Sequence, residues 1–124
     1  MAKSHAARMN KVLEKIEITA VVDIDLDRAQ MVAELFPNKP VVHKNYEEIL
    51  DNVDATLVVL PHHLHHPVTI KCLNEGTHVL VEKPMANTER ECLEMIASAR
   101  RNNPILMVGY CTVSYTHLTL PTKA

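Results

Sequence analysis

Four of the eight histidines in this chain lie within five residues, in the stretch LPHHLHHP at 60–67. Imidazole is a common ligand of zinc and other transition metals, so metal binding is the first chemistry to consider. Pro61 follows an apolar run typical of a strand, and Pro67 disfavours helical angles at His66. We therefore expect the histidines on an extended loop rather than on one helical face, and we expect no metal site. Metal capture by four adjacent imidazoles remains the alternative.

Polar residues also follow three other apolar runs. Asp23 comes directly after ITAVV, the tripeptide Glu82-Lys83-Pro84 begins where HVLV ends, and Gly109-Tyr110 follows ILMV. In open parallel sheets, ligands bind beyond the carboxyl ends of the strands. These residues, together with the histidine stretch, are therefore the candidates for a binding site.

Asp23 has the position of an acid that accepts hydrogen bonds from the ribose hydroxyls of a dinucleotide. Its charge would repel a 2′-phosphate by roughly 4 kcal/mol at about 4 Å and an effective dielectric near 20. This sign favours NAD over NADP. A helix N-cap or a solvated turn carboxylate is the structural alternative for Asp23.

Apolar runs alternate with helical periodicity along the whole chain. Strands are predicted at 16–23, 41–42, 55–60, 78–82 and 105–108, and helices at 1–16, 26–36, 46–50, 67–75 and 88–101. The strands are apolar on both faces and the connections are short, which indicates a parallel sheet covered by helices on both sides. The fold class is therefore α/β.

Composition narrows the function classes. The 124 residues are 47% hydrophobic, enough for one modest domain, and the charge is nearly balanced, with 13 basic and 15 acidic residues. No basic run suggests nucleic acid or an anionic membrane as partner, and no apolar run is long enough to span a bilayer. The three cysteines form no CxxC motif and are expected to be reduced thiols of a cytoplasmic protein.

The beginning of the chain reads as a helix without a strand before it. A dinucleotide fingerprint G-x-G-x-x-G/A precedes its ribose-binding acid by about 20 residues. Ala2 lies 21 positions before Asp23, so Met1 and Ala2 have the spacing of the last two residues of an interrupted fingerprint.

Residues 2–110 resemble the N-terminal half of the glucose–fructose oxidoreductase / inositol dehydrogenase (Gfo/Idh/MocA) family. The resemblance rests on an ordered set: Pro61 and His65 as P-x-x-x-H, then Glu82-Lys83-Pro84, then Gly109-Tyr110. It extends back through YEEIL and AVVDIDLDRA to SHAARM. It implies a Rossmann-type doubly wound parallel sheet and hydride transfer between NAD, or alternatively NADP, and a sugar, inositol or similar small molecule.

The resemblance also implies roles for individual residues. Asp23 would bind the ribose, and the loop with Pro61, His62 and His65 would run past the cofactor, although His62 replaces the family's asparagine. Glu82, Lys83 and Pro84 would lie near the nicotinamide ribose, with Lys83 catalytic at the reacting oxygen. His5 would be structural.

The chain departs from the family at both ends. The first, central strand has no counterpart, which is expected to separate ITAVV from ATLVVL and leave the sheet incomplete. We expect residues 1–111 to be a partial dinucleotide-binding domain and 112–124 to be a non-native or disordered tail. The family's C-terminal substrate domain, through which homo-oligomers form, is not recognised. The alternatives are a non-catalytic module that binds a dinucleotide or a metal, and a fragment without function.

Overall fold

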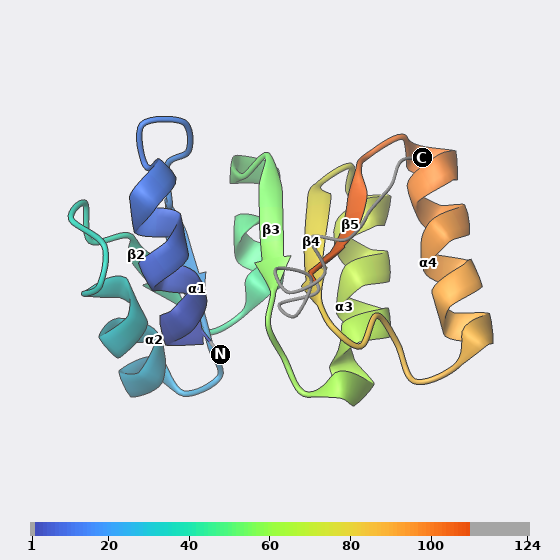
Figure 1. The fold of residues 1–124 in the computed structure, drawn as a ribbon, viewed down its shortest axis with the longest axis horizontal. Coiled ribbons are helices and arrows are strands. Elements are labelled where there is room, and N and C mark those ends of the chain that lie inside the picture. The colour runs from blue at the N-terminus through green and yellow to red at the C-terminus, as the bar shows by residue number, and fades with distance from the viewer. Residues whose placement is uncertain (1, 110–124) are drawn as a thin grey trace, which may run out of the picture. The chain divides into compact units, whose positions relative to one another are not determined.

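The computed structural model describes residues 2–109. The elements follow in the order α1 (Ala2–Met9), the 3₁₀ helix η1 (Asn10–Val12), β1 (Ala20–Val22), α2 (Leu26–Ala33), β2 (Val41–His43), the 3₁₀ helix η2 (Tyr46–Asn52), β3 (Ala55–Val58), α3 (His62–Asn74), β4 (His78–Glu82), α4 (Glu89–Asn102) and β5 (Leu106–Gly109) (Figure 1). The alternation of strands and helices is the predicted one. The tail predicted at 112–124 lies outside the described residues.

All described strand pairs are parallel, which confirms the α/β prediction. They form two sheets, β1–β2 and β3–β4–β5, in two compact units that meet at Asp54 and Ala55 in the sequence. β1 and β3 thus belong to different sheets, as expected for ITAVV and ATLVVL without a strand between them. The predicted strand at 16–23 is shorter than expected, since only Ala20–Val22 pairs.

In the first unit, α2 packs on β1 and β2. Ala29 and Ala33 of α2, and Phe36 just after it, are 1–3% exposed. Asp25 begins the helix, because its side chain accepts hydrogen bonds from the backbone N–H groups of Asp27 and Arg28.

The short helix predicted at 46–50 is a 3₁₀ helix that begins after Asn45, whose side chain accepts from the Glu47 N–H. Asn45 and Glu48 have the spacing of a capping box, but the reciprocal bond is not formed. Glu48 instead places its Oε2 3.2 Å from Nδ1 of His43.

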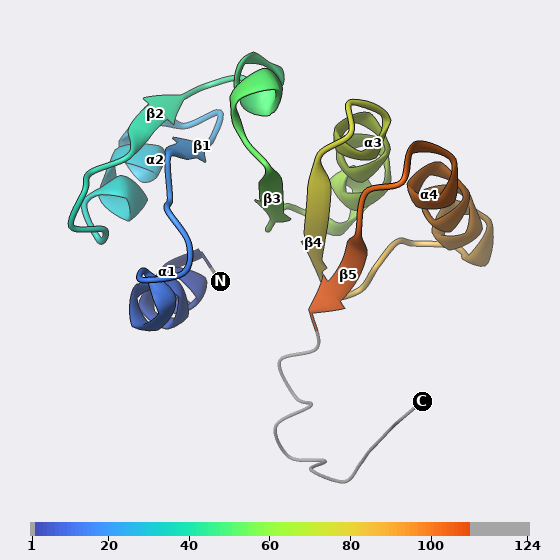
Figure 2. The same ribbon diagram turned by 90° about the horizontal axis from the view of Figure 1, so that it is seen from above.

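In the second unit, α3 and α4 lie side by side on one face of the β3–β4–β5 sheet (Figure 2). Val79 and Val81 of β4 are at most 2% exposed, as are Leu73 of α3 and Met95 of α4. Burying a side chain of this size contributes about 2 kcal/mol, so this layer is a main source of stability in the unit.

Local capping motifs define the end of α3 and the start of α4. Gly76 adopts a φ of +81°, and its N–H and that of Thr77 donate to Leu73 O and Cys72 O, which completes a Schellman motif. Thr88 and Glu91 form a capping box at the start of α4. None of the helices within residues 2–109 is long and apolar enough to cross a membrane.

Candidate functional site

Asp23 directly follows β1, and its N–H continues the β1–β2 ladder by donating to His43 O. Its Oδ1 accepts from the Asp25 N–H at 2.9 Å, and its Oδ2 lies 3.2 Å from Nε of Arg28. The side chain is 28% exposed. The N-cap role belongs to Asp25, so Asp23 is a turn carboxylate that still presents part of its surface to solvent.

Arg28 is a residue of this site that the sequence analysis did not identify. It lies in the first turn of α2 and also approaches Asp25, with Nη2 3.6 Å from Oδ2. The sequence contained a signal for this role, because Arg28 comes five residues after Asp23. That spacing places it in the first turn of the helix that follows the strand. Its charge reduces the repulsion that Asp23 alone would exert on a phosphate.

The histidine stretch is not an extended loop, and that prediction was wrong. α3 begins at His62 and contains Pro67, with Leu64 N–H donating to Pro61 O in the first turn. Pro67 forfeits one helical hydrogen bond. The helical turn nevertheless forms, because it directs the His65 side chain back toward the N-terminus, where it reaches backbone acceptors.

The four histidines have different surroundings. His62 and His63 are exposed, and His66 places Nε2 2.7 Å from Oε2 of Glu94 on α4. His65 is 1% exposed. Within residues 2–109, no group of three or more His, Cys, Asp or Glu side chains is arranged to hold a metal ion.

His65 joins two backbone segments. Its Nδ1 lies 2.7 Å from the carbonyl oxygen of Pro84, and its Nε2 lies 2.8 Å from that of Leu60. Leu60 follows β3 and Pro84 follows β4, so the histidine connects the chain beyond the carboxyl ends of two neighbouring strands. The segments that contain Pro61 and Pro84 are 23 positions apart in the sequence. Through His65 they are linked at one end of the sheet in the second unit.

The tripeptide Glu82-Lys83-Pro84 continues from β4. Glu82 is 4% exposed and pairs with Gly109 of β5 in the register, while the Lys83 N–H donates to Gly109 O at 3.3 Å. The Lys83–Pro84 peptide bond is cis. A Cβ at Gly109 would meet Glu82 Oε2 at 3.9 Å and Leu80 Cδ1 at 3.7 Å, so the strand ends are in van der Waals contact there. The hydrogen bond to Gly109 O thus holds the Lys83 main chain beside β5, and the residue itself is half-buried.

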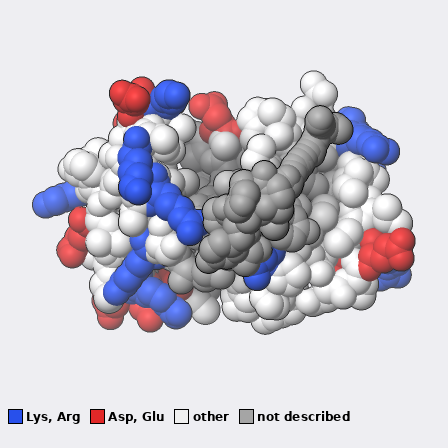
Figure 3. Space-filling view, viewed as in Figure 1, with Lys and Arg blue, Asp and Glu red and all other residues white. Residues whose placement is uncertain are grey.

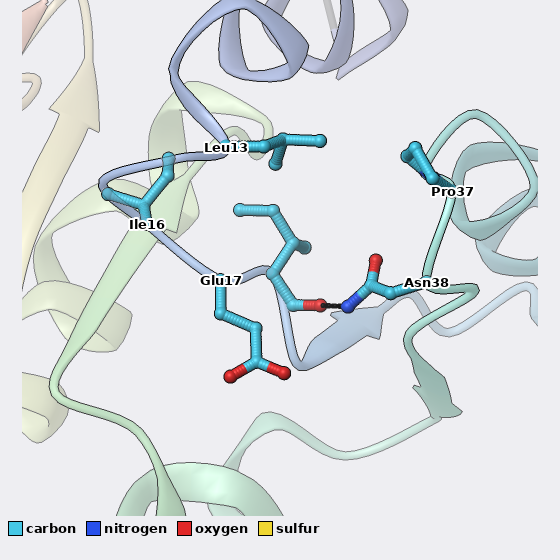
Figure 4. A pocket seen from close by; sticks show the side chains of 6 residues that line it. Leu13, Ile16, Glu17, Pro37 and Asn38 are labelled. Carbon is cyan, nitrogen blue, oxygen red and sulfur yellow. Dashed lines mark hydrogen bonds between the residues drawn. The ribbon is translucent and has the colours of Figure 1, made fainter.

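A pocket of about 310 Å³ lies elsewhere in the first unit, lined by Leu13, Ile16, Glu17, Ile18, Pro37 and Asn38 (Figure 4). Asn38 Nδ2 donates to Ile18 O at 2.8 Å across one side of it. Its lining precedes β1 and β2, whereas Asp23 follows β1. None of the predicted site residues lines this pocket.

Charges of both signs appear on the face of the molecule drawn in Figure 3. On the described residues of that face, neither positive nor negative side chains form one continuous covering.

Comparison with known proteins identifies the family and agrees with the parallel α/β fold. The sequence profile of the Gfo/Idh/MocA group, described as "Oxidoreductase family, NAD-binding Rossmann fold", matches residues 1–110. The chain therefore belongs to this family of NAD-binding oxidoreductases.

Curated relatives are enzymes of more than one specificity. The chain is 38% identical to the trans-1,2-dihydrobenzene-1,2-diol dehydrogenase of Mus musculus over 93 residues, which are 73% of this chain and 28% of that protein. It is 31% identical to the inositol 2-dehydrogenase of Arthrobacter sp. (strain FB24) over 113 residues, which are 89% of this chain and 33% of that protein. The chain thus spans about a third of the length of these relatives.

Solved structures of the family carry bound dinucleotides. The WlbA dehydrogenase of Chromobacterium violaceum, in complex with NADH and UDP-GlcNAcA, matches with a TM-score of 0.78 and 29% identity over 87% of this chain and 31% of that one. KijD10, a 3-ketoreductase of Actinomadura kijaniata in complex with NADP and TDP-benzene, matches with a TM-score of 0.75 and 31% identity over 84% of this chain and 32% of that one.

Proposed function

We propose that this chain is the dinucleotide-binding part of an oxidoreductase that transfers hydride between NAD(P) and a hydroxyl or carbonyl carbon of a sugar, inositol or related small molecule. The observation that carries the proposal is the placement of Glu82-Lys83-Pro84 at the carboxyl end of β4, where His65 of the P-x-x-x-H stretch contacts Pro84 O. These are the motifs on which the family resemblance rests.

The residues present fit a dinucleotide. Asp23 Oδ1 and Oδ2 each have one observed donor, and a carboxylate offers about four lone-pair sites, so acceptor capacity remains for a ribose diol. Arg28 supplies a cation beside the same carboxylate. We assign Asp23 to the ribose, and Pro61 and His62 to the cofactor's flank. Glu82, Lys83 and Pro84 are assigned to the surroundings of the nicotinamide ribose.

The nicotinamide supplies the hydride chemistry. Lys83 is assigned to the substrate oxygen, where its ammonium stabilises negative charge as a hydroxyl loses its proton, or donates a hydrogen bond to a carbonyl. Glu82 is the last residue of β4, and the Lys83 N–H donates to Gly109 O. Both features limit main-chain motion at Lys83. A fixed main chain lowers the cost of orienting the ammonium at the reacting atom.

Isotope-edited NMR of the ¹⁵N-labelled chain tests the proposal, because it detects millimolar binding. Addition of NADH should shift the backbone resonances of Asp23 and Lys83, whereas AMP should shift Asp23 and leave Lys83 unchanged. Asp23→Asn should weaken the response to both ligands. If millimolar NADH shifts neither residue, the assignment of these residues to a dinucleotide is wrong.

The substrate class needs a separate assay. Reduction of NAD or NADP should be followed at 340 nm in an active enzyme that carries this domain, with inositols, sugars and dihydrodiols as candidate substrates. Turnover of at least one polyol or sugar supports the proposed class. Turnover restricted to unrelated alcohols or amines would contradict it.

A further inference from the structure

We propose that His65 is a positioning residue that holds the Lys83–Pro84 segment against the end of β3 without touching the cofactor itself. This inference rests on the proposed function only for its catalytic consequence, because the contacts of His65 stand independently of any ligand.

Burial and contacts together indicate the role. The side chain is 1% exposed, and both ring nitrogens lie within 2.8 Å of backbone carbonyl oxygens, those of Pro84 and Leu60. A side chain enclosed in this way has no ring nitrogen left for a ligand. His62 and His63, on the same helical turn, are exposed.

The two contacts constrain the form of the ring. A carbonyl oxygen only accepts hydrogen bonds, so each ring nitrogen must donate to make its bond. Neutral imidazole has one N–H, and only the imidazolium ion has two. A ring with one N–H therefore makes one of the two hydrogen bonds at a time, and the proposal requires the one from Nδ1 to Pro84 O, the shorter contact at 2.7 Å.

The mechanical consequence falls on Lys83. Pro84 has no N–H of its own, and its carbonyl is held by His65, while the Lys83 N–H is held by Gly109 O. The segment is thus fixed from two sides, by α3 and by β5. Among residues 2–109, loss of the His65 contact leaves the bond to β5 as the hydrogen bond at Lys83–Pro84, and this bond is long at 3.3 Å.

The ring proton can be observed directly in the unmutated, ¹⁵N-labelled chain. His65 should show a slowly exchanging ring N–H resonance on Nδ1, the nitrogen that faces Pro84 O. Exposed His62 and His63 should show none. Absence of a slow ring N–H on His65, or its assignment to Nε2, would remove the bond to Pro84 and overturn the proposal.

Hydrogen exchange then separates positioning from a general structural role. In His65→Gln, the amide nitrogen takes the place of Nε2 and leaves no donor at the place of Nδ1, so the Pro84 contact is lost and the Lys83 amide should exchange about tenfold faster. The Leu80 amide, within the same strand, should change much less. His63→Gln, an exposed position on the same turn, should change neither. Equal acceleration at Leu80 and Lys83 would mean general destabilisation and would overturn the proposal.

The catalytic consequence is measured in an active enzyme that carries this domain. His65→Gln should lower kcat about tenfold with little change in the Kd for NADH. In the background of Lys83→Met it should lower kcat no further, because its effect acts through that lysine. An additive loss in the double variant would overturn the catalytic consequence. If Lys83→Met itself has no effect while the exchange result holds, the proposed function fails and the His65 bridge stands.

Discussion

Arg28 and Asp23 form an ion pair at the end of β1, with Nε of Arg28 3.2 Å from Oδ2 of Asp23. The acid that would repel a 2′-phosphate thus lies beside a cation that would attract one. Because the Arg28 side chain is 63% exposed, solvent weakens both effects. We therefore expect the preference between NAD and NADP to depend on both residues rather than on Asp23 alone.

Replacing Arg28 by alanine should shift this balance toward NADH. The ratio of the Kd for NADPH to that for NADH should rise on the order of threefold, as expected for an exposed charge, and the change should shrink at high salt. Asp23→Asn should shift the ratio in the opposite direction. Fluorescence titration with both cofactors measures it. Arg90→Ala, which removes an exposed arginine paired with Glu94, is the control; an equal shift there would contradict the role of Arg28.

Replacing Lys83 by methionine in an active enzyme should lower kcat by about 10²–10⁴-fold, the range for loss of a positioned proton-transfer group. The Kd for NADH should change little, since methionine keeps the length and apolar stem of the side chain. Stopped-flow kinetics and equilibrium titration give the two quantities. Lys71→Met, at a lysine of α3 that pairs with Glu75 at 3.0 Å, provides the matched control. A kcat equal to that of the control would remove Lys83 from the mechanism.

The thiol of Cys72 should make stability fall at alkaline pH. Burial raises the pKa of this thiol, and a hydrogen bond with Thr56 opposes the shift. A raised pKa in the folded state means that the unfolded chain loses the proton first, so the stabilisation is complete below the ordinary thiol pKa of roughly 8.5 and is lost as the pH rises above it. Urea unfolding between pH 7 and 10 measures the effect.

The control for this prediction is Cys72→Ala, which should show a flatter dependence on pH over the same interval. Cys92, which is only partly buried, should react with iodoacetamide before Cys72 does. Equal slopes in the two proteins would show that Cys72 is not the group responsible.

Removal of the α4 cap should cost about 1 kcal/mol. In Thr88→Ala the Glu91 N–H loses its acceptor, which lies at 3.1 Å, and the reciprocal bond from the Thr88 N–H to Glu91 weakens with it. Chemical denaturation measures the change in the free energy of unfolding. Asn87→Ala, at an exposed neighbour that contributes only its backbone to this cap, should change it by less than about 0.5 kcal/mol.

Sequence patterns predicted the strands that are buried on one side by helices. HVLVE was predicted at 78–82 and is observed as β4 over the same residues, because Val79 and Val81 provide a continuous apolar contact with the helical layer. At 16–23 the same kind of apolar run yields a strand of only three residues, Ala20–Val22. β2 is itself only three residues long, so the ladder extends beyond β1 only through Thr19 O and the Asp23 N–H.

The histidine stretch marks the limit of local rules. The restriction that proline places on the preceding residue predicted an extended His66, yet α3 runs through it. Two long-range facts decided the outcome: the acceptor on Pro84 and the Glu94 carboxylate beside His66. Neither is visible from the neighbours of His66 in the sequence. Arg28 was missed for a different reason, since none of the roles considered for Asp23 (ribose binding, a helix N-cap or a solvated turn carboxylate) includes an ion pair with the helix that follows.

The division of the strands into two ladders affects how local unfolding of the chain should be measured. Within residues 2–109, β1 and β2 hydrogen-bond to each other, and β3, β4 and β5 form a separate ladder. Amide exchange measures opening in each ladder separately. A weakened α4 cap should lower protection around Val81, and a smaller change around Val21 would show that the two ladders open with different free energies.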